Sequence, residues 1–78
     1  MKFYKWLNEA KARYYTISVE KNEDNENNIV LYHSWGSCIT RRGGKKIVSV
    51  GSESDVRNVI NQMIKRRKSR GYELLTAA

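Results

Sequence analysis

The sequence contains very few of the residues that cross-link a chain or hold a metal. Cys38 is the one cysteine and His33 the one histidine among 78 residues, and proline is absent. A single cysteine excludes an internal disulfide, and a lone His/Cys pair excludes a zinc site built from those ligands. We therefore expect a hydrophobic core, alone or with a partner chain, to stabilise the fold. We predict no metal and no cofactor.

Long hydrophobic runs are also missing. No apolar segment approaches the roughly 20 residues of a membrane-spanning helix, and residues 1–6 lack the apolar stretch of a signal peptide. The length of 78 residues fits one domain, and without proline or a linker no boundary divides residues 1–78. These features predict a single cytoplasmic domain with no membrane contact.

Positive charge is abundant and unevenly placed. The chain has 15 Lys/Arg and 8 Asp/Glu, which gives a net charge of +7 and a pI near 9.8. Clustered cations with acids elsewhere are typical of phosphate-binding surfaces, although a basic surface can also serve solubility alone. The two basic blocks are Arg41, Arg42, Lys45 and Lys46, and Lys65, Arg66, Arg67, Lys68 and Arg70.

Most of the chain has the patterns of β-strands. Residues 14–20 alternate between apolar and polar, and residues 29–35 are rich in β-branched and aromatic side chains, so these two segments predict a hairpin. The polar residues 21–28 suit the loop between them. Gly43 and Gly44 suggest a turn, because glycine adopts positive φ easily. Further candidate strands are residues 3–7, 37–40, 45–50 and 72–75.

One amphipathic helix is predicted over residues 53–70. Ser52 and Asp55 form a capping box, and Gly71 is placed to end the helix in a left-handed conformation. Together with the strands, this predicts an α+β fold: an antiparallel sheet of about four to five strands with one C-terminal amphipathic helix packed on it. The apolar stripe on the helix consists of Val56, Val59, Ile60, Met63 and Ile64.

The basic end of this helix bears on function. At about 100° per residue, Arg67 falls on the same side of the helix as Ile60 and Met63. Either the helix end overhangs the sheet, or Arg67 reaches outward over its edge. In both cases we expect the basic end to project beyond the core. Residues 65–70 hold more bases than the helix dipole needs, so part of the cluster is predicted to contact phosphate.

An ordered series of short motifs runs along the chain. It starts with the adjacent tyrosines Tyr14-Tyr15 in the first strand of the predicted hairpin. It continues through an acidic loop to Ser34-Trp35-Gly36 and ends with Arg70-Gly71-Tyr72 after the helix. The run Arg41-Arg42-Gly43-Gly44 lies between, and residues 8–13 lead in. From residue 13 to 73 at least, this order resembles the WGR domain. That domain is known from DNA-break-activated poly(ADP-ribose) polymerases and from short bacterial proteins.

The resemblance implies a non-catalytic module that binds DNA at ends or breaks. In the polymerases the family tryptophan packs on the sugar of a terminal nucleotide, a role that falls to Trp35. Arg13 matches a basic contact to the 5′ phosphate, Gly36 leaves backbone room for the ligand, and Tyr72 matches an aromatic residue that borders the site. We therefore expect Trp35 to be exposed rather than packed in the core, where we place Trp6.

The sequence departs from the family at one position. Ser37 stands where the motif arginine is found, so an end-specific phosphate contact needs another donor. Arg41 or Arg42 can supply the charge from the next turn. A serine hydroxyl can also bond a phosphate oxygen, but without the charge assistance of arginine.

Catalysis finds little support, because no third group orients Cys38 and His33 as a nucleophile and base. A lone cysteine is more often a small buried hydrophobe.

We expect sequence-independent binding to DNA ends, nicks or overhangs, with RNA as a weaker variant. The alternative is a protein-interaction module whose basic face docks an acidic partner. The predicted binding residues are Arg13, Trp35, Gly36, Ser37, Arg41, Arg42, Lys45, Lys46, Arg67, Arg70 and Tyr72.

Overall fold

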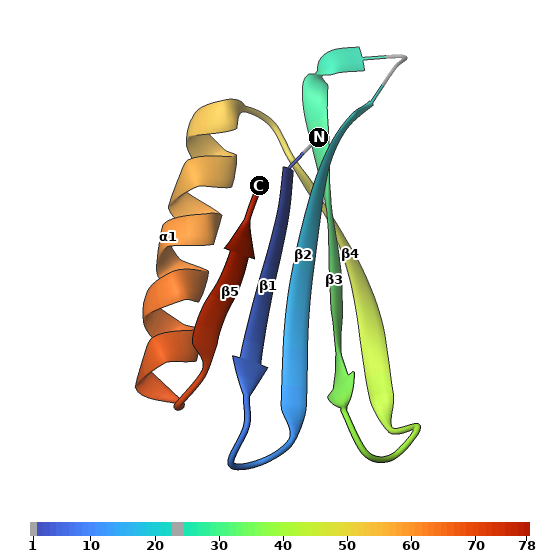
Figure 1. Cartoon of the computed structure of the whole chain (residues 1–78). Helices are drawn as coiled ribbons and strands as arrows, with labels where there is room; N and C mark the ends of the chain where they lie inside the picture. The colour runs from blue at the N-terminus through green and yellow to red at the C-terminus, as the bar shows by residue number, and fades with distance from the viewer. Residues whose placement is uncertain (1, 23–24) are drawn as a thin grey trace.

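A five-stranded antiparallel sheet with one helix against it makes up the fold of the computed structural model, which describes residues 2–22 and 25–78 (Figure 1). The predicted α+β class is therefore confirmed, with five strands in the order β4-β3-β2-β1-β5. The elements are β1 (Lys2–Asn8), β2 (Arg13–Asn22), β3 (Asn25–Ser37), β4 (Gly43–Val50), α1 (Glu53–Ser69) and β5 (Glu73–Ala77).

The core lies between α1 and one face of the sheet. Trp6, Ile17 and Leu31 come from three neighbouring strands and are fully buried, and Ile60 of α1 packs against them. Since strand side chains alternate between faces, every second residue of each strand points toward α1. Trp6 is thus a core residue, as predicted. The helix lies near β5 and β1, and β3 and β4 extend farther from it (Figure 1).

Ser52 and Gly71 cap the two ends of α1 as predicted, although the described hydrogen bonds include only one of the two expected for a capping box. The Ser52 hydroxyl accepts a hydrogen bond of 3.2 Å from the Asp55 N–H at the N-terminus. At the C-terminus Gly71 has a φ of 85°. The Gly71 and Tyr72 N–H groups donate to the carbonyls of Lys68 and Arg67. Within the described residues, no helix has the length and apolar character needed to cross a membrane.

Two predicted boundaries are wrong. The loop expected over residues 21–28 is shorter, because β2 continues to Asn22 and β3 starts at Asn25; residues 23–24 lie outside the described residues. Backbone pairing does not depend on side-chain polarity, so the hairpin extends into the polar run. The short strand expected over residues 37–40 is largely a loop, since β3 ends at Ser37. The Ser37 hydroxyl accepts from the N–H groups of Ile39 and Thr40, which turns the chain.

Gly43 and Gly44 allow the neighbouring strand and its indole to approach β4 closely, and they do not adopt the positive φ that we predicted. Gly43 and Gly44 both lie in β4, and neither has a positive φ. A Cβ at Gly43 would lie 2.4 Å from the Trp35 carbonyl oxygen, and one at Gly44 would lie 2.6 Å from Cζ2 of the indole. The missing side chain at Gly44 is therefore what lets the Trp35 indole lie across the neighbouring strand β4.

Replacing Gly71 with alanine should destabilise the protein by about 1–2 kcal/mol, because an L-residue is strained in the left-handed region. The new Cβ would also lie 3.3 Å from Asn8 Nδ2. Gly51→Ala is the matched control, since its Cβ would meet only Asp55 Oδ2 at 3.7 Å. Urea unfolding measures both variants. Equal loss in the two would contradict a specific role for the Gly71 conformation.

Candidate functional site

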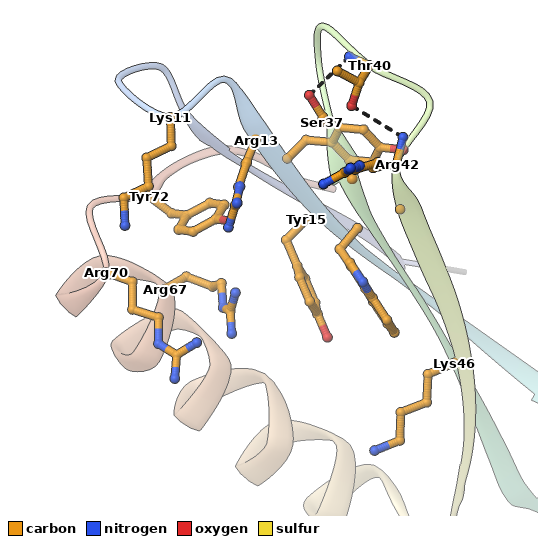
Figure 2. Close-up of a pocket in the computed structure, with 14 residues that line it drawn as sticks. Lys11, Arg13, Tyr15, Ser37, Thr40, Arg42, Lys46, Arg67, Arg70 and Tyr72 are labelled. Atoms are coloured by element: carbon orange, nitrogen blue, oxygen red, sulfur yellow. Dashed lines mark hydrogen bonds between the residues drawn. The ribbon is translucent and has the colours of Figure 1, made fainter.

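An open pocket of about 1120 Å³ lies at one end of the sheet, where β2 begins, β3 ends and β4 begins. The C-terminal end of α1 and the residues leading into β5 form its other side (Figure 2). Segments far apart in the sequence therefore meet here. The lining residues are Lys11, Arg13, Tyr14, Tyr15, Trp35, Gly36, Ser37, Thr40, Arg42, Gly43, Lys46, Arg67, Arg70 and Tyr72.

Trp35 is the exposed aromatic residue in this pocket. Its side chain is 37% exposed, whereas Trp6 is 1% exposed. The indole stacks on Tyr15, its direct partner across β2 and β3, with ring centroids 5.9 Å apart and planes 12° apart. On its other side the indole lies against Gly44 of β4. Trp35 is thus held rigidly between two strands while part of its ring system stays open to solvent.

Arg67 continues this aromatic row toward the helix. Its guanidinium carbon lies 4.6 Å from the centroid of the Tyr15 ring and 5.3 Å from that of Tyr72. The outward reach that we considered for Arg67 is wrong, because cation–π contact draws its side chain inward between the two rings. Among the described residues, none accepts a hydrogen bond from the buried Nε. The other bases of this end, Lys65, Arg66, Lys68 and Arg70, are exposed.

Cations surround the row on both sides. Figure 2 shows Lys11 and Arg13 near the start of β2, Arg67 and Arg70 at the end of α1, and Arg42 and Lys46 beside β4. None of the lining residues is acidic. Arg42 and Lys46 of one basic block and Arg67 and Arg70 of the other therefore face one hollow, and their summed positive field favours an anionic ligand.

Ser37 organises the loop that carries Arg42. Its hydroxyl accepts hydrogen bonds of 3.1 Å from the N–H groups of Ile39 and Thr40, and its own N–H donates to the Arg42 carbonyl at 2.9 Å. The Arg42 N–H in turn donates to the Thr40 hydroxyl. The oxygen of Ser37 is thus engaged within the loop, and the residue acts on the pocket mainly by positioning Arg42.

The pocket includes most of the predicted binding residues but leaves out two of them. Arg41 is exposed on the loop and Lys45 points to the face of the sheet away from α1, and neither lines the pocket. Strand alternation explains Lys45, because its neighbour Lys46 occupies the helix side. The predicted residues that do meet there are Arg13, Trp35, Gly36, Ser37, Arg42, Lys46, Arg67, Arg70 and Tyr72.

Some lining residues were missed by the sequence analysis. Tyr15 alternates with the buried Ile17, and its cross-strand partner is Trp35, so the register of the hairpin was the signal that could have found it. Cys38, in contrast, is exposed and not a buried hydrophobe, because it lies on the loop after β3. The missed residues are Lys11, Tyr14, Tyr15, Thr40 and Gly43.

A partly buried hydrogen bond links Tyr15 of this aromatic row to His33. Tyr15 Oη lies 2.7 Å from His33 Nδ1, and His33 is only 6% exposed. Burial lowers the pKa of His33, and the charge of Lys46, its partner on β4, lowers it further. Burial raises the pKa of Tyr15, a rise that the cations Arg67 and Arg66 oppose. Both groups are therefore neutral at pH 7.

Comparison with known proteins identifies a family. The family model described as the WGR domain matches residues 2–77. No curated protein and no solved structure matches the chain significantly.

Stability should fall with acidification through His33, the one histidine of the sequence. Its folded pKa lies below the ordinary value of 6.5 for histidine, so the unfolded chain binds more protons. Stability present above pH 6.5 is lost as the pH falls toward the folded pKa. Urea midpoints between about pH 7.5 and 5.5 measure this loss. His33→Gln should flatten the dependence. An unchanged slope in that variant would contradict the assignment to His33.

Proposed function

Because the chain belongs to the WGR domain family, we propose that it is a sequence-independent DNA-binding module that prefers ends, nicks or overhangs. WGR domains are small non-catalytic modules that bind nucleic acids in proteins related to poly(ADP-ribose) polymerases. One observation carries the proposal: a partly exposed Trp35 lies in a pocket lined by six Lys/Arg and by no acid.

A sugar–phosphate chain fits the two kinds of surface in the pocket. The open part of the Trp35 ring offers apolar contact to a sugar or base, and such stacking tolerates every base. Cations line the same pocket, with Arg13 and Arg67 on the side of α1 and Arg42 and Lys46 on the side of β4 (Figure 2). These contacts position a backbone without reading base edges, which accounts for sequence independence.

In this proposal Arg42 replaces the arginine that the family has at position 37. Ser37 fixes the loop through its hydroxyl, and the loop brings Arg42 to the pocket while Arg41 stays outside. The charge is thus supplied from a site a few residues farther along the chain. A 5′ phosphate between Arg42 and Arg13 would receive charge-assisted hydrogen bonds from both sides.

Trp35→Ala should weaken binding to linear duplex DNA about tenfold or more, because stacking contributes about 1–3 kcal/mol per base. Binding to closed circles should weaken less. Fluorescence anisotropy and competition with circular DNA measure the two affinities. Ile39→Ala is the control, since Ile39 is 82% exposed but does not line the pocket. Equal loss on ends and circles would refute an end-binding role.

Arg42→Gln should remove the advantage of a 5′-phosphorylated duplex over its unphosphorylated twin. It should also reduce the slope of log affinity against log salt by about 0.9, as one phosphate contact is lost. The adjacent Arg41→Gln is the matched control, because it removes the same charge outside the pocket.

The binding of wild-type protein to DNA decides between the two kinds of partner. If wild-type protein shows no saturable binding to blunt, nicked or overhang DNA at low salt, the proposal fails. An acidic protein partner would then be the better explanation of the basic pocket.

A further inference from the structure

The face of the sheet that points away from α1 has an unusual set of exposed side chains. Strand register orders them into rows that cross the strands. Phe3, Ser18, Tyr32 and Ile47 form one row; Phe3 is 39% and Tyr32 41% exposed, and Ile47 67%. Among the described residues, no helix or strand covers this face.

The neighbouring row is polar and basic. It consists of Lys5, Thr16, Ser34 and Lys45, so two cations flank two hydroxyl groups across four strands. Both lysines are exposed. Two acids in the described part of this face, Glu20 and Glu73, lie outside both rows. The Lys45 that the pocket leaves out therefore belongs to a second basic surface.

The two surfaces are continuous around the end of the sheet. Tyr14, Gly36 and Gly43 point away from α1 by strand alternation, yet they line the same pocket as Tyr15 and Trp35. A Cβ at Gly36 would lie 2.9 Å from Tyr14 Oη, so the Tyr14 ring covers this glycine closely. Along β2, Thr16 of the lysine row lies two residues beyond Tyr14, and Ser18 of the row of Phe3 and Tyr32 lies two residues farther. The distance from Tyr14 to Ser18 is about 14 Å, at 3.4 Å per residue.

We infer that this open face binds a single-stranded nucleic acid that continues from the pocket. Exposed aromatic rings on a sheet stack bases, and lysines beside them neutralise the phosphates between those bases. Phe3 and Tyr32 lie two strands apart, about 10 Å, and present their rings to the same side. The inference rests on the proposed function, because the pocket is where the end of the nucleic acid is held. It names the preferred ligand: a duplex end with a single-stranded extension.

The lysines favour a polyanion over a second copy of the chain. Two facing copies would bring cationic rows from a protein of net charge +7 together, with no acid in either row to pair with them. A nucleic acid satisfies both rows at once, with bases on the aromatic rings and phosphates at the lysines.

The test compares labelled probes by fluorescence anisotropy: a blunt duplex, the same duplex with an overhang of about ten thymidines, the free oligothymidylate and the matching oligouridylate. Wild-type protein should bind the overhang duplex about tenfold more tightly than the blunt one. Tyr32→Leu keeps an apolar side chain but removes the ring. It should reduce the overhang affinity to that of the blunt duplex and leave blunt binding unchanged.

A charge variant tests the basic row. Lys5→Gln with Lys45→Gln should lower the salt slope for the oligothymidylate by about 1.4, from two contacts of about 0.7 each. Lys65→Gln with Lys68→Gln is the matched control, because these exposed helix residues lie outside the pocket. Equal effects of the two double variants would overturn the inference. Oligouridylate affinity shows whether the face separates DNA from RNA.

The remaining outcomes separate this inference from the proposed function. If Trp35→Ala has no effect but Tyr32→Leu weakens oligothymidylate binding, the pocket proposal fails and the open face stands. If overhang and blunt duplex bind equally and Tyr32→Leu changes neither, the open face fails alone. Sedimentation velocity without nucleic acid provides the last check: a dimer that Tyr32→Leu dissociates, with overhang affinity unchanged, would assign the face to self-association.

Discussion

The contact between the Arg67 guanidinium and the Tyr15 ring holds the pocket together. It joins the end of α1 to the middle of the sheet, and it does so beside the stack of Tyr15 on Trp35. The hydrogen bond from Asn8 Nδ2 to the Arg70 carbonyl fixes the same helix end to β1. Because Tyr15 also bonds His33, the same ring connects the pocket to the buried part of the sheet. One tyrosine therefore sets the relative positions of an exposed aromatic residue and the charges around it.

Much of the fold follows from patterns in the sequence. Hydrophobic periodicity located α1 and the main strands, and the capping residues Ser52 and Gly71 act as expected. Periodicity does not predict how far backbone pairing extends, and the β2–β3 hairpin is longer than its polar residues suggested. The glycines of β4 illustrate a further limit. Local preference suggests a turn, whereas the reason for Gly44 is an indole that arrives from a different strand.

The candidate site was predictable in part for the same reason. Trp35 and the basic blocks stand out in the sequence, and the structure brings most of them together. The choice between Arg41 and Arg42, or between Lys45 and Lys46, depends on which face each residue occupies. For the lysines this is a property of strand register, which only the paired strands define. For the arginines it is set by the hydrogen bonds of Ser37 and Thr40 within the loop. Arg67 was located on the correct stripe of the helix, but its direction depended on two tyrosines from other elements.

Tyr14 and Tyr15 are neighbours in the chain, yet they serve opposite sides of the sheet. Because their side chains alternate, the register of β2 fixes at once which residues face the pocket and which face the open side. The short turn of residues 9–12 leads into that strand. A one-residue shift of β2 would exchange the two rings and invert both surfaces, but it would also move the buried Ile17 out of the core, which opposes the shift. A change in the length of this turn must therefore leave the same side chains of β2 on each face. A substitution within the turn is not subject to that requirement, because it does not change the register.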